Sequence, residues 1–437
     1  MGTSAPPDNR KPKPPQGEML SVSNWRSYVI LFRTNPRFTR LWLAGVISQF
    51  GNWFNYIAVF VLLQQLTGSG MAVSWFLIAK FIPSTLLGPA AGVLADRFSR
   101  KAIMIGADLL RVGVVLCFLF INRPEQVWLV YTLALLQESL WTFADPARRA
   151  SIPNLCRPEE LNLANALGGA TWSVMLAFGA ALGGFTTAHF GWRTAIVLDA
   201  ATFLISALMI TGLALPPLQR RLNQKPSLAD YLGFNDLREG LHYVVRHRQV
   251  AALLLVKSGW ALSGGVLVML TVFGEQVFAA KHGQGGNSGI LYSCRGIGAA
   301  LGPLVAWRLF GESRQEMSRA IGISFFAASV AYIFFSQAPT LGWAAFFVFC
   351  GHLGGAVQWV FSTTLLQKMV EDRFLGRVFA AEMAFLTLVL SLSTYFTGAA
   401  LEHGTDPRVV VLRLALLFML PGLVWTMYRR TASAKGL

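Results

Sequence analysis

Apolar runs of about 20 residues recur along nearly the whole chain of 437 residues, and twelve of them can be counted. A helix of this length crosses a hydrocarbon core of about 30 Å. Hydrophobic residues make up 54% of the chain and charged residues only 13%, roughly half the charged share of a soluble domain. The sequence therefore predicts an all-α, polytopic membrane protein with twelve transmembrane helices.

The expected spans are separated by short loops, with one longer connection in the middle of the chain. They are 41–66, 71–94, 102–121, 126–144, 161–187, 194–214, 251–278, 288–310, 318–336, 341–366, 376–401 and 409–428. In the long connection, Leu237, Leu241 and Val244 are spaced for one face of a helix. We expect that helix to lie along the membrane surface, as does the segment 25–32 near the N-terminus.

The chain contains an internal repeat with an offset of 214 residues. Leu87-Gly88-Pro89 and Ser99-Arg100 return as Leu301-Gly302-Pro303 and Ser313-Arg314. An offset close to half the chain predicts two pseudo-symmetric six-helix halves, related by an axis along the membrane normal. The predicted division is an N-terminal arm (1–38) with a disordered tail at about 1–22, two bundles (39–214 and 251–428), a linker (215–250) and a C-terminal tail (429–437).

The 37 Lys and Arg residues are distributed unevenly between the two sides of the predicted spans. With the N-terminus placed in the cytoplasm, 28 of them fall in the inside segments and four in the outside loops. This asymmetry is typical of membrane topology, and it places both termini in the cytoplasm. The net charge of +16 is therefore no sign of a nucleic-acid partner, and we expect a multi-pass protein of the cell's inner (cytoplasmic) membrane.

The run from Gly92 to Lys101 resembles the loop motif between the second and third helices of the major facilitator superfamily. Other stretches resemble the branch of that superfamily with enterobactin exporters and macrolide efflux proteins. They are 35–42, 66–69, 107–111, 146–150, 236–240 and 375–378, and together they cover nearly the whole chain. The resemblance implies a transporter whose substrate binds between the two halves near the middle of the membrane.

The resemblance also implies a conformational latch in the loop motif, formed by Gly92, Asp96, Arg97, Arg100 and Lys101. Gly92 would allow close approach of a neighbouring helix, and Asp96 would pair with nearby cations while the protein faces outward. The alternative is that these are ordinary loop charges. An acid in an otherwise basic short loop favours the latch, because topology alone does not call for it.

Ionisable residues within spans are costly and are therefore candidates for function. Asp108 and Arg111 are three residues apart on one helix face, so we expect them to form a structural pair. Lys257 lies near the cytoplasmic end of its span, where we expect it to snorkel.

The repeat offset relates two further sets of polar residues. Lys80 corresponds to a position next to Arg295, and Glu138 corresponds to His352. We expect Lys80 and Arg295, with Trp141 and Trp359, to bind substrate, and Glu138, His352 and Glu382 to carry protons. The alternatives for the charged residues are snorkelling or a buried local ion pair, and for the tryptophans core packing or interface anchoring.

These features predict a secondary active transporter that exports an amphipathic, anionic or oxygen-rich small molecule, siderophore-like or drug-like, in exchange for protons. Two alternatives stay open: a lysophospholipid transporter and a membrane receptor that does not transport. Motifs for a nucleotide loop, a zinc protease or a serine hydrolase do not occur in the sequence. We therefore expect no enzyme, no cofactor and no metal, and we expect a monomer whose other partners are protons and membrane lipids.

Overall fold

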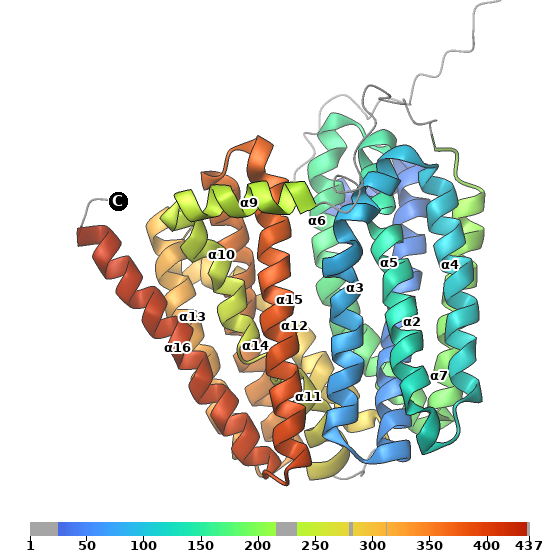
Figure 1. The fold of residues 1–437 in the computed structure, drawn as a ribbon. Helices are drawn as coiled ribbons and strands as arrows, with labels where there is room; N and C mark the ends of the chain where they lie inside the picture. The colour runs from blue at the N-terminus through green and yellow to red at the C-terminus, as the bar shows by residue number, and fades with distance from the viewer. Residues whose placement is uncertain (1–24, 216–233, 279–282, 312, 435–437) are drawn as a thin grey trace, which may run out of the picture.

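The computed structural model describes residues 25–215, 234–278, 283–311 and 313–434, and within these ranges every regular element is helical. The helices stand in two bundles, and α9 (Phe234–Arg246) lies across one end (Figure 1). We call this the α9 end of the molecule and the opposite end the far end. The predicted disordered tail, 1–22, lies outside the described residues.

The N-terminal half begins with a short helix, α1 (Trp25–Thr34), and then contains long helices. They are α2 (Pro36–Thr67), α3 (Gly70–Arg97), α4 (Arg100–Cys117), α5 (Val127–Leu155), α6 (Pro158–Val174) and α7 (Ala180–Thr211), with 3-10 turns at Phe118–Phe120 and Pro124–Gln126. A π-helical turn, Met175–Gly179, joins α6 to α7.

The C-terminal half follows α9 with a helix that is interrupted, and then with five long helices. They are α10 (Arg248–Ala261), α11 (Val266–Val272), α12 (Gly286–Phe310), α13 (Arg314–Ser336), α14 (Leu341–Met369), α15 (Asp372–Glu402) and α16 (Pro407–Ala434). The break between α10 and α11 is stabilised from α15, where the Ser393 hydroxyl accepts from the amide of Gly265 and donates to the carbonyl of Leu262. A second π-helical turn, Phe273–Val277, follows α11.

The internal repeat is visible in the helix boundaries. Helix α5 spans Val127–Leu155, and α14 spans Leu341–Met369, 214 residues later at both ends. The repeated Ser-Arg dipeptide also has the same local role in both halves. The hydroxyl of Ser99 caps α4 and that of Ser313 caps α13, each accepting from a backbone amide three residues on.

The structure confirms the predicted twelve spans. Ten described segments are long and apolar enough to cross a membrane. One of them runs from Pro158 to Thr211 and turns at Gly191, where a φ of 81° favours glycine, so it makes two spans. Helix α5 is the twelfth span; it packs against α3 and α4, and its interior is less apolar because it carries Glu138 and Arg148.

The two halves are closely packed toward the far end. Gln276 of the C-terminal half donates to the side chain of Gln64 and to the carbonyl of Gly68, both at 3.1 Å. Gly184 of α7 and Gly289 of α12 cross so closely that a Cβ on either would lie 2.8 Å from the other's Cα. The glycine-rich stretch before Phe185 therefore permits tight helix packing.

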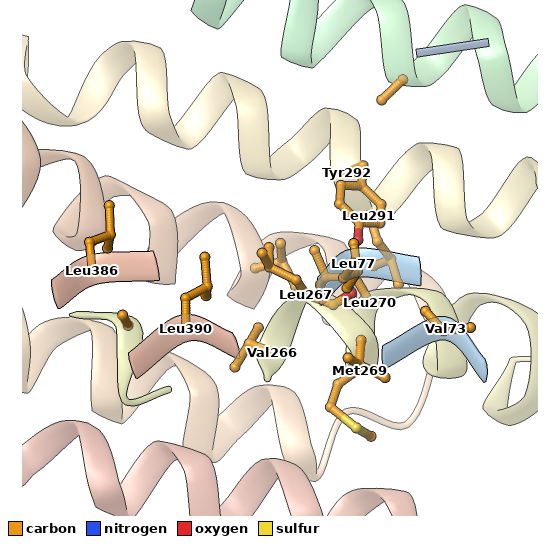
Figure 2. Packing of buried hydrophobic residues seen from close by; sticks show 14 of the residues in the cluster. Val73, Leu77, Val266, Leu267, Met269, Leu270, Leu291, Tyr292, Leu386 and Leu390 are labelled. Carbon is orange, nitrogen blue, oxygen red and sulfur yellow. The ribbon is translucent and has the colours of Figure 1, made fainter. Parts of the chain in front are cut away.

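An apolar cluster continues this contact between the halves. Figure 2 shows Val73 and Leu77 of α3 beside Leu270 of α11 and Tyr292 of α12, all of them buried. Toward the α9 end the picture changes. A Cβ added at Gly88, Gly92 or Gly168 would meet no described atom within 4 Å beyond its own helix. The described contacts between the halves are thus concentrated at the far end.

Candidate functional site

Lys80 of α3 and Glu138 of α5 form an ion pair within the N-terminal half, with 3.4 Å between Lys80 Nζ and Glu138 Oε2. The lysine side chain is 9% exposed and the carboxylate 20%. Nζ also lies 5.3 Å from the ring centroid of Tyr56 and 5.7 Å from that of Phe76, where aromatic faces attract a cation. We call Lys80 and Glu138 the N-terminal pair.

Arg295 of α12 and His352 of α14 occupy the corresponding place in the other half. Arg295 Nε donates to His352 Nε2 at 3.0 Å. A guanidinium can only donate, so Nε2 is the acceptor and the neutral ring carries its hydrogen on Nδ1. Nδ1 lies 2.7 Å from the hydroxyl of Tyr332 and 3.3 Å from the carbonyl of Val348. We call Arg295 and His352 the C-terminal pair.

Two tyrosines lie between these pairs at the contact of the halves. The rings of Tyr56 and Tyr292 are 6.1 Å apart in an edge-to-face arrangement. Tyr292 lies 6.0 Å from the guanidinium carbon of Arg295, and its hydroxyl donates to the carbonyl of Leu267. Lys80 and Arg295, predicted from the sequence as substrate ligands, are thus placed at the two ends of one aromatic bridge.

Asp108 and Arg111 meet as the sequence predicts, with 3.7 Å between Arg111 NH1 and Asp108 Oδ1, and both are 1% exposed. Arg111 also donates to Asn52 of α2 and lies 3.7 Å from the ring centroid of Phe203 of α7. Ser206 of α7 donates to the second oxygen of Asp108 at 2.7 Å. The pair therefore ties α4 to α2 and α7, which favours a structural role.

Trp141 lies inside the N-terminal half between two arginines. Its ring centroid is 5.4 Å from the guanidinium carbon of Arg111 and 5.7 Å from that of Arg148. Arg148 is only 9% exposed, although sequence reasoning counted it among the loop cations. Its side chain reaches back along α5 toward Gly45 of α2, so its charge belongs to the bundle interior and not to the loop.

Lys257 of α10 does not snorkel, contrary to expectation. Its Nζ lies 2.6 Å from Glu382 Oε2 of α15, and the two side chains are 5% and 1% exposed. The ring of Trp359, a predicted substrate contact, covers the lysine at 4.8 Å and is 40% exposed. Glu382, a predicted proton carrier, is therefore half of a closed ion pair. The partners are 125 residues apart in the chain, so no local pattern could have joined them.

Asp199 of α7 is a buried carboxylate that sequence reasoning missed. It is 0% exposed, and neither of its oxygens has a hydrogen-bond partner among the described residues. It faces α2, since a Cβ at Gly51 would lie 2.5 Å from Asp199 Oδ1. Arg111 and Lys80 are the cations that act on it electrostatically. A single acid in an apolar run, with no charged neighbour in sequence, was the available signal.

The predicted latch residues lie at the α9 end, where α3 passes into α4. Arg100 Nε donates to the carbonyl of Ala95 at 3.1 Å, and NH1 donates to that of Ala150 in α5. The side chain of Asp96 lies outside the described residues. The close approach expected at Gly92 is not realised here, because no described neighbour lies against it. Arg97 is exposed and Lys101 is half-buried.

Comparisons with known proteins agree with this architecture. Macrolide efflux protein A from Streptococcus pyogenes is 25% identical over 382 residues, which cover 86% of this chain and 89% of that protein. The uncharacterized MFS-type transporter YkuC from Bacillus subtilis is 23% identical over 374 residues, covering 82% and 84%. The predicted resemblance to macrolide efflux proteins is thereby confirmed.

Solved structures share the fold. A bacterial homolog of the human lysosomal transporter Spinster, inward-facing and unoccupied, superposes with a TM-score of 0.69 at 14% identity, covering 91% of this chain and 98% of that one. The nucleoside transporter NupG gives a TM-score of 0.66 at 13% identity, covering 90% and 98%. The family model for the Major Facilitator Superfamily matches residues 41–394. The chain therefore belongs to the Major Facilitator Superfamily, as a multi-pass membrane transporter.

Proposed function

We propose that this transporter is a proton-coupled exporter of an amphipathic, anionic small molecule. The observation that carries the proposal is the difference in charge between the two pairs. Lys80 is neutralised by Glu138, whereas the contact partner of Arg295 is a neutral imidazole. Arg295 forms no ion pair with any described side chain, so its charge is available to an anion.

The wider charge balance supports the same assignment. The described spans of the N-terminal half carry three cations of low exposure, Lys80, Arg111 and Arg148, and three carboxylates, Glu138, Asp108 and Asp199. In the C-terminal half, Glu382 balances Lys257, which leaves Arg295. An unbalanced cation away from water attracts an anionic group strongly, and an arginine can bind a carboxylate or phosphate through two hydrogen bonds.

The N-terminal pair supports a role in proton coupling. Glu138 is the more exposed partner, so it can exchange protons while Lys80 stays in place. A carboxylate that is paired with a cation in one conformation and separated from it in another releases and takes up a proton in turn. We propose that Glu138 carries the proton and that the pair separates during the transport cycle.

The packing of the halves supports an inward-open state in an alternating-access cycle. Contacts such as Gln276 with Gln64 close the far end, and the positive-inside topology makes that end the outside. The Gly92 helix would then meet its neighbour only in the outward-open state, where Asp96, Arg97, Arg100 and Lys101 form the latch. Cysteines introduced at Gln284 and in the linker should be labelled only from outside and only from the cytoplasm, respectively.

The proposal is tested with the purified protein in liposomes carrying an imposed proton gradient. Three labelled probes separate the candidate substrate classes: the catecholate siderophore enterobactin, erythromycin and lysophosphatidylglycerol. Gradient-dependent uptake of the catecholate supports the proposal. Transport of erythromycin alone would replace it with macrolide efflux, which the relatives at about 25% identity favour. Transport of the lysophospholipid would assign the lipid alternative, and binding without transport a receptor.

A further inference from the structure

A second site lies outside the region between the halves, in a hollow of about 650 Å³ between α13 and α16. Seven residues line it: Arg319, Gly322, Ile323, Phe326, Thr426, Arg429 and Arg430. None of them has a role in the proposed transport cycle. The two helices lie at the edge of the molecule, on the side of the C-terminal half away from the N-terminal half (Figure 1).

The hollow exists because a glycine stands at its base. A Cβ at Gly322 would lie 3.3 Å from the hydroxyl oxygen of Thr426 and 3.3 Å from the indole of Trp425. The helices are fixed beside it by the indole N–H of Trp425, which donates to the carbonyl of Ser318 at 2.8 Å. A larger side chain at position 322 would therefore fill space that the pinned helices cannot give up.

The charge of the hollow is strongly positive. Arg319 comes from the first turns of α13, and Arg429 and Arg430 come from the last turns of α16. The guanidinium of Arg429 is repelled by that of Arg319 and attracted by one carboxylate, Glu316. Three cations held near a single acid favour an anion in the space between them, and an arginine cluster suits phosphate oxygens.

The position of the hollow decides which anion fits. Both arginine-bearing helix ends lie at the α9 end, which the charge distribution places on the cytoplasmic side. Below the arginines, Ile323 and Phe326 continue the wall along the span, and Ile323 is 43% exposed. A ligand here meets positive charge at headgroup depth and an apolar surface at acyl-chain depth. Basic pockets between helices on the cytoplasmic side are typical binding sites for anionic lipid headgroups.

We infer that the hollow between α13 and α16 binds the phosphate headgroup of an anionic phospholipid, with its acyl chains along Ile323 and Phe326. The lipid holds the ends of the two helices together by neutralising the facing arginines. This site is independent of the transported substrate, so failure of the lipid assignment leaves the proposed function intact.

The test is lipid binding to the purified full-length protein, measured by native mass spectrometry with phosphatidylglycerol and with phosphatidylcholine of the same acyl chains. We expect phosphatidylglycerol to bind about tenfold more tightly, and Arg319→Gln with Arg429→Gln to abolish most of that preference. The matched control is Arg149→Gln, which changes an exposed arginine at the same end of the other half. Equal binding of both lipids, or an unchanged preference in the double variant, would overturn the inference.

A second variant and a second anion sharpen the result. Gly322→Leu fills the hollow without removing charge and should lower phosphatidylglycerol binding as the double variant does. If that variant fails to fold, the arginine variants still decide the question. Thermal unfolding with inorganic phosphate distinguishes the sources of the anion: no shift is expected from phosphate at concentrations where the lipid stabilises, and an equal shift would assign a soluble anion site instead.

Discussion

The N-terminal and C-terminal pairs occupy matching places in the repeat but differ in charge. Lys80 and Glu138 join α3 to α5 as opposite charges 3.4 Å apart. Arg295 and His352 join α12 to α14 as a cation and a neutral ring 3.0 Å apart. The difference teaches that the repeat preserves where polar groups meet while each half has its own chemistry.

A division of roles follows from that difference. In the balanced half, loss of one partner leaves a charge uncompensated in the bundle interior, which costs stability or coupling. In the other half, Arg295 keeps its charge, so its loss should cost substrate affinity. The predictions below test this distinction, beginning with the largest expected effect.

Lys257→Met should cost about 3–5 kcal/mol of unfolding free energy, because it leaves Glu382 buried without its partner. The double change Lys257→Met with Glu382→Met removes both charges and should recover most of that loss. Thermal unfolding of the purified variants measures both effects. Equal destabilisation of the single and double variants would show that Lys257 and Glu382 do not act as a balanced pair.

Arg295→Ala should weaken binding of an anionic substrate by about 1–3 kcal/mol, the range for a lost charge-assisted hydrogen bond. That corresponds to a rise of about 5- to 150-fold in the half-saturating concentration. Lys80→Ala should raise it too but by less, since Glu138 already neutralises Lys80. Initial transport rates against substrate concentration measure both. A larger effect at Lys80 would reverse the assignment of the two pairs.

His352→Gln should flatten the pH dependence of substrate affinity. In the native protein a proton on Nε2 removes the acceptor for Arg295, which frees the guanidinium, so affinity for an anion should rise as the pH falls. The other groups around the ring are Tyr332 and the carbonyl of Val348, and neither supplies a charge. We expect a change of about two- to tenfold between pH 8 and pH 5, reduced in the variant.

The control for that experiment is His403→Gln, which changes an exposed histidine at the far end. It should keep the native pH profile. A profile that stays steep in His352→Gln would remove the imidazole from the affinity of Arg295.

Much of the fold could be predicted from the sequence, because apolar length and internal repetition are local properties. The 214-residue offset predicted the relation between α5 and α14, and the repeated Ser99 and Ser313 proved to be helix caps. The π-helical turns at Met175–Gly179 and Phe273–Val277 were not predicted, since nothing in their composition separates them from the helices they interrupt.

The candidate site was less predictable, because its partners come from distant helices. Repeat arithmetic brought Lys80 and Glu138 forward as separate candidates, but not their contact with each other. Lys257 was placed at the membrane surface because Glu382 lies 125 residues away. Arg148 was counted with the loop because three-dimensional packing, and not its position beside Arg149, turns its side chain inward.

The central claim is that Glu138 carries the proton while Arg295 binds the substrate. Its most direct test is proton movement in liposomes, followed with an internal pH-sensitive dye as substrate is added to native protein, Arg295→Ala and Glu138→Gln. Native protein should move protons with substrate, Arg295→Ala should do so only at higher substrate concentration, and Glu138→Gln should exchange substrate without proton movement. Substrate-dependent proton movement of normal size in Glu138→Gln would contradict the account.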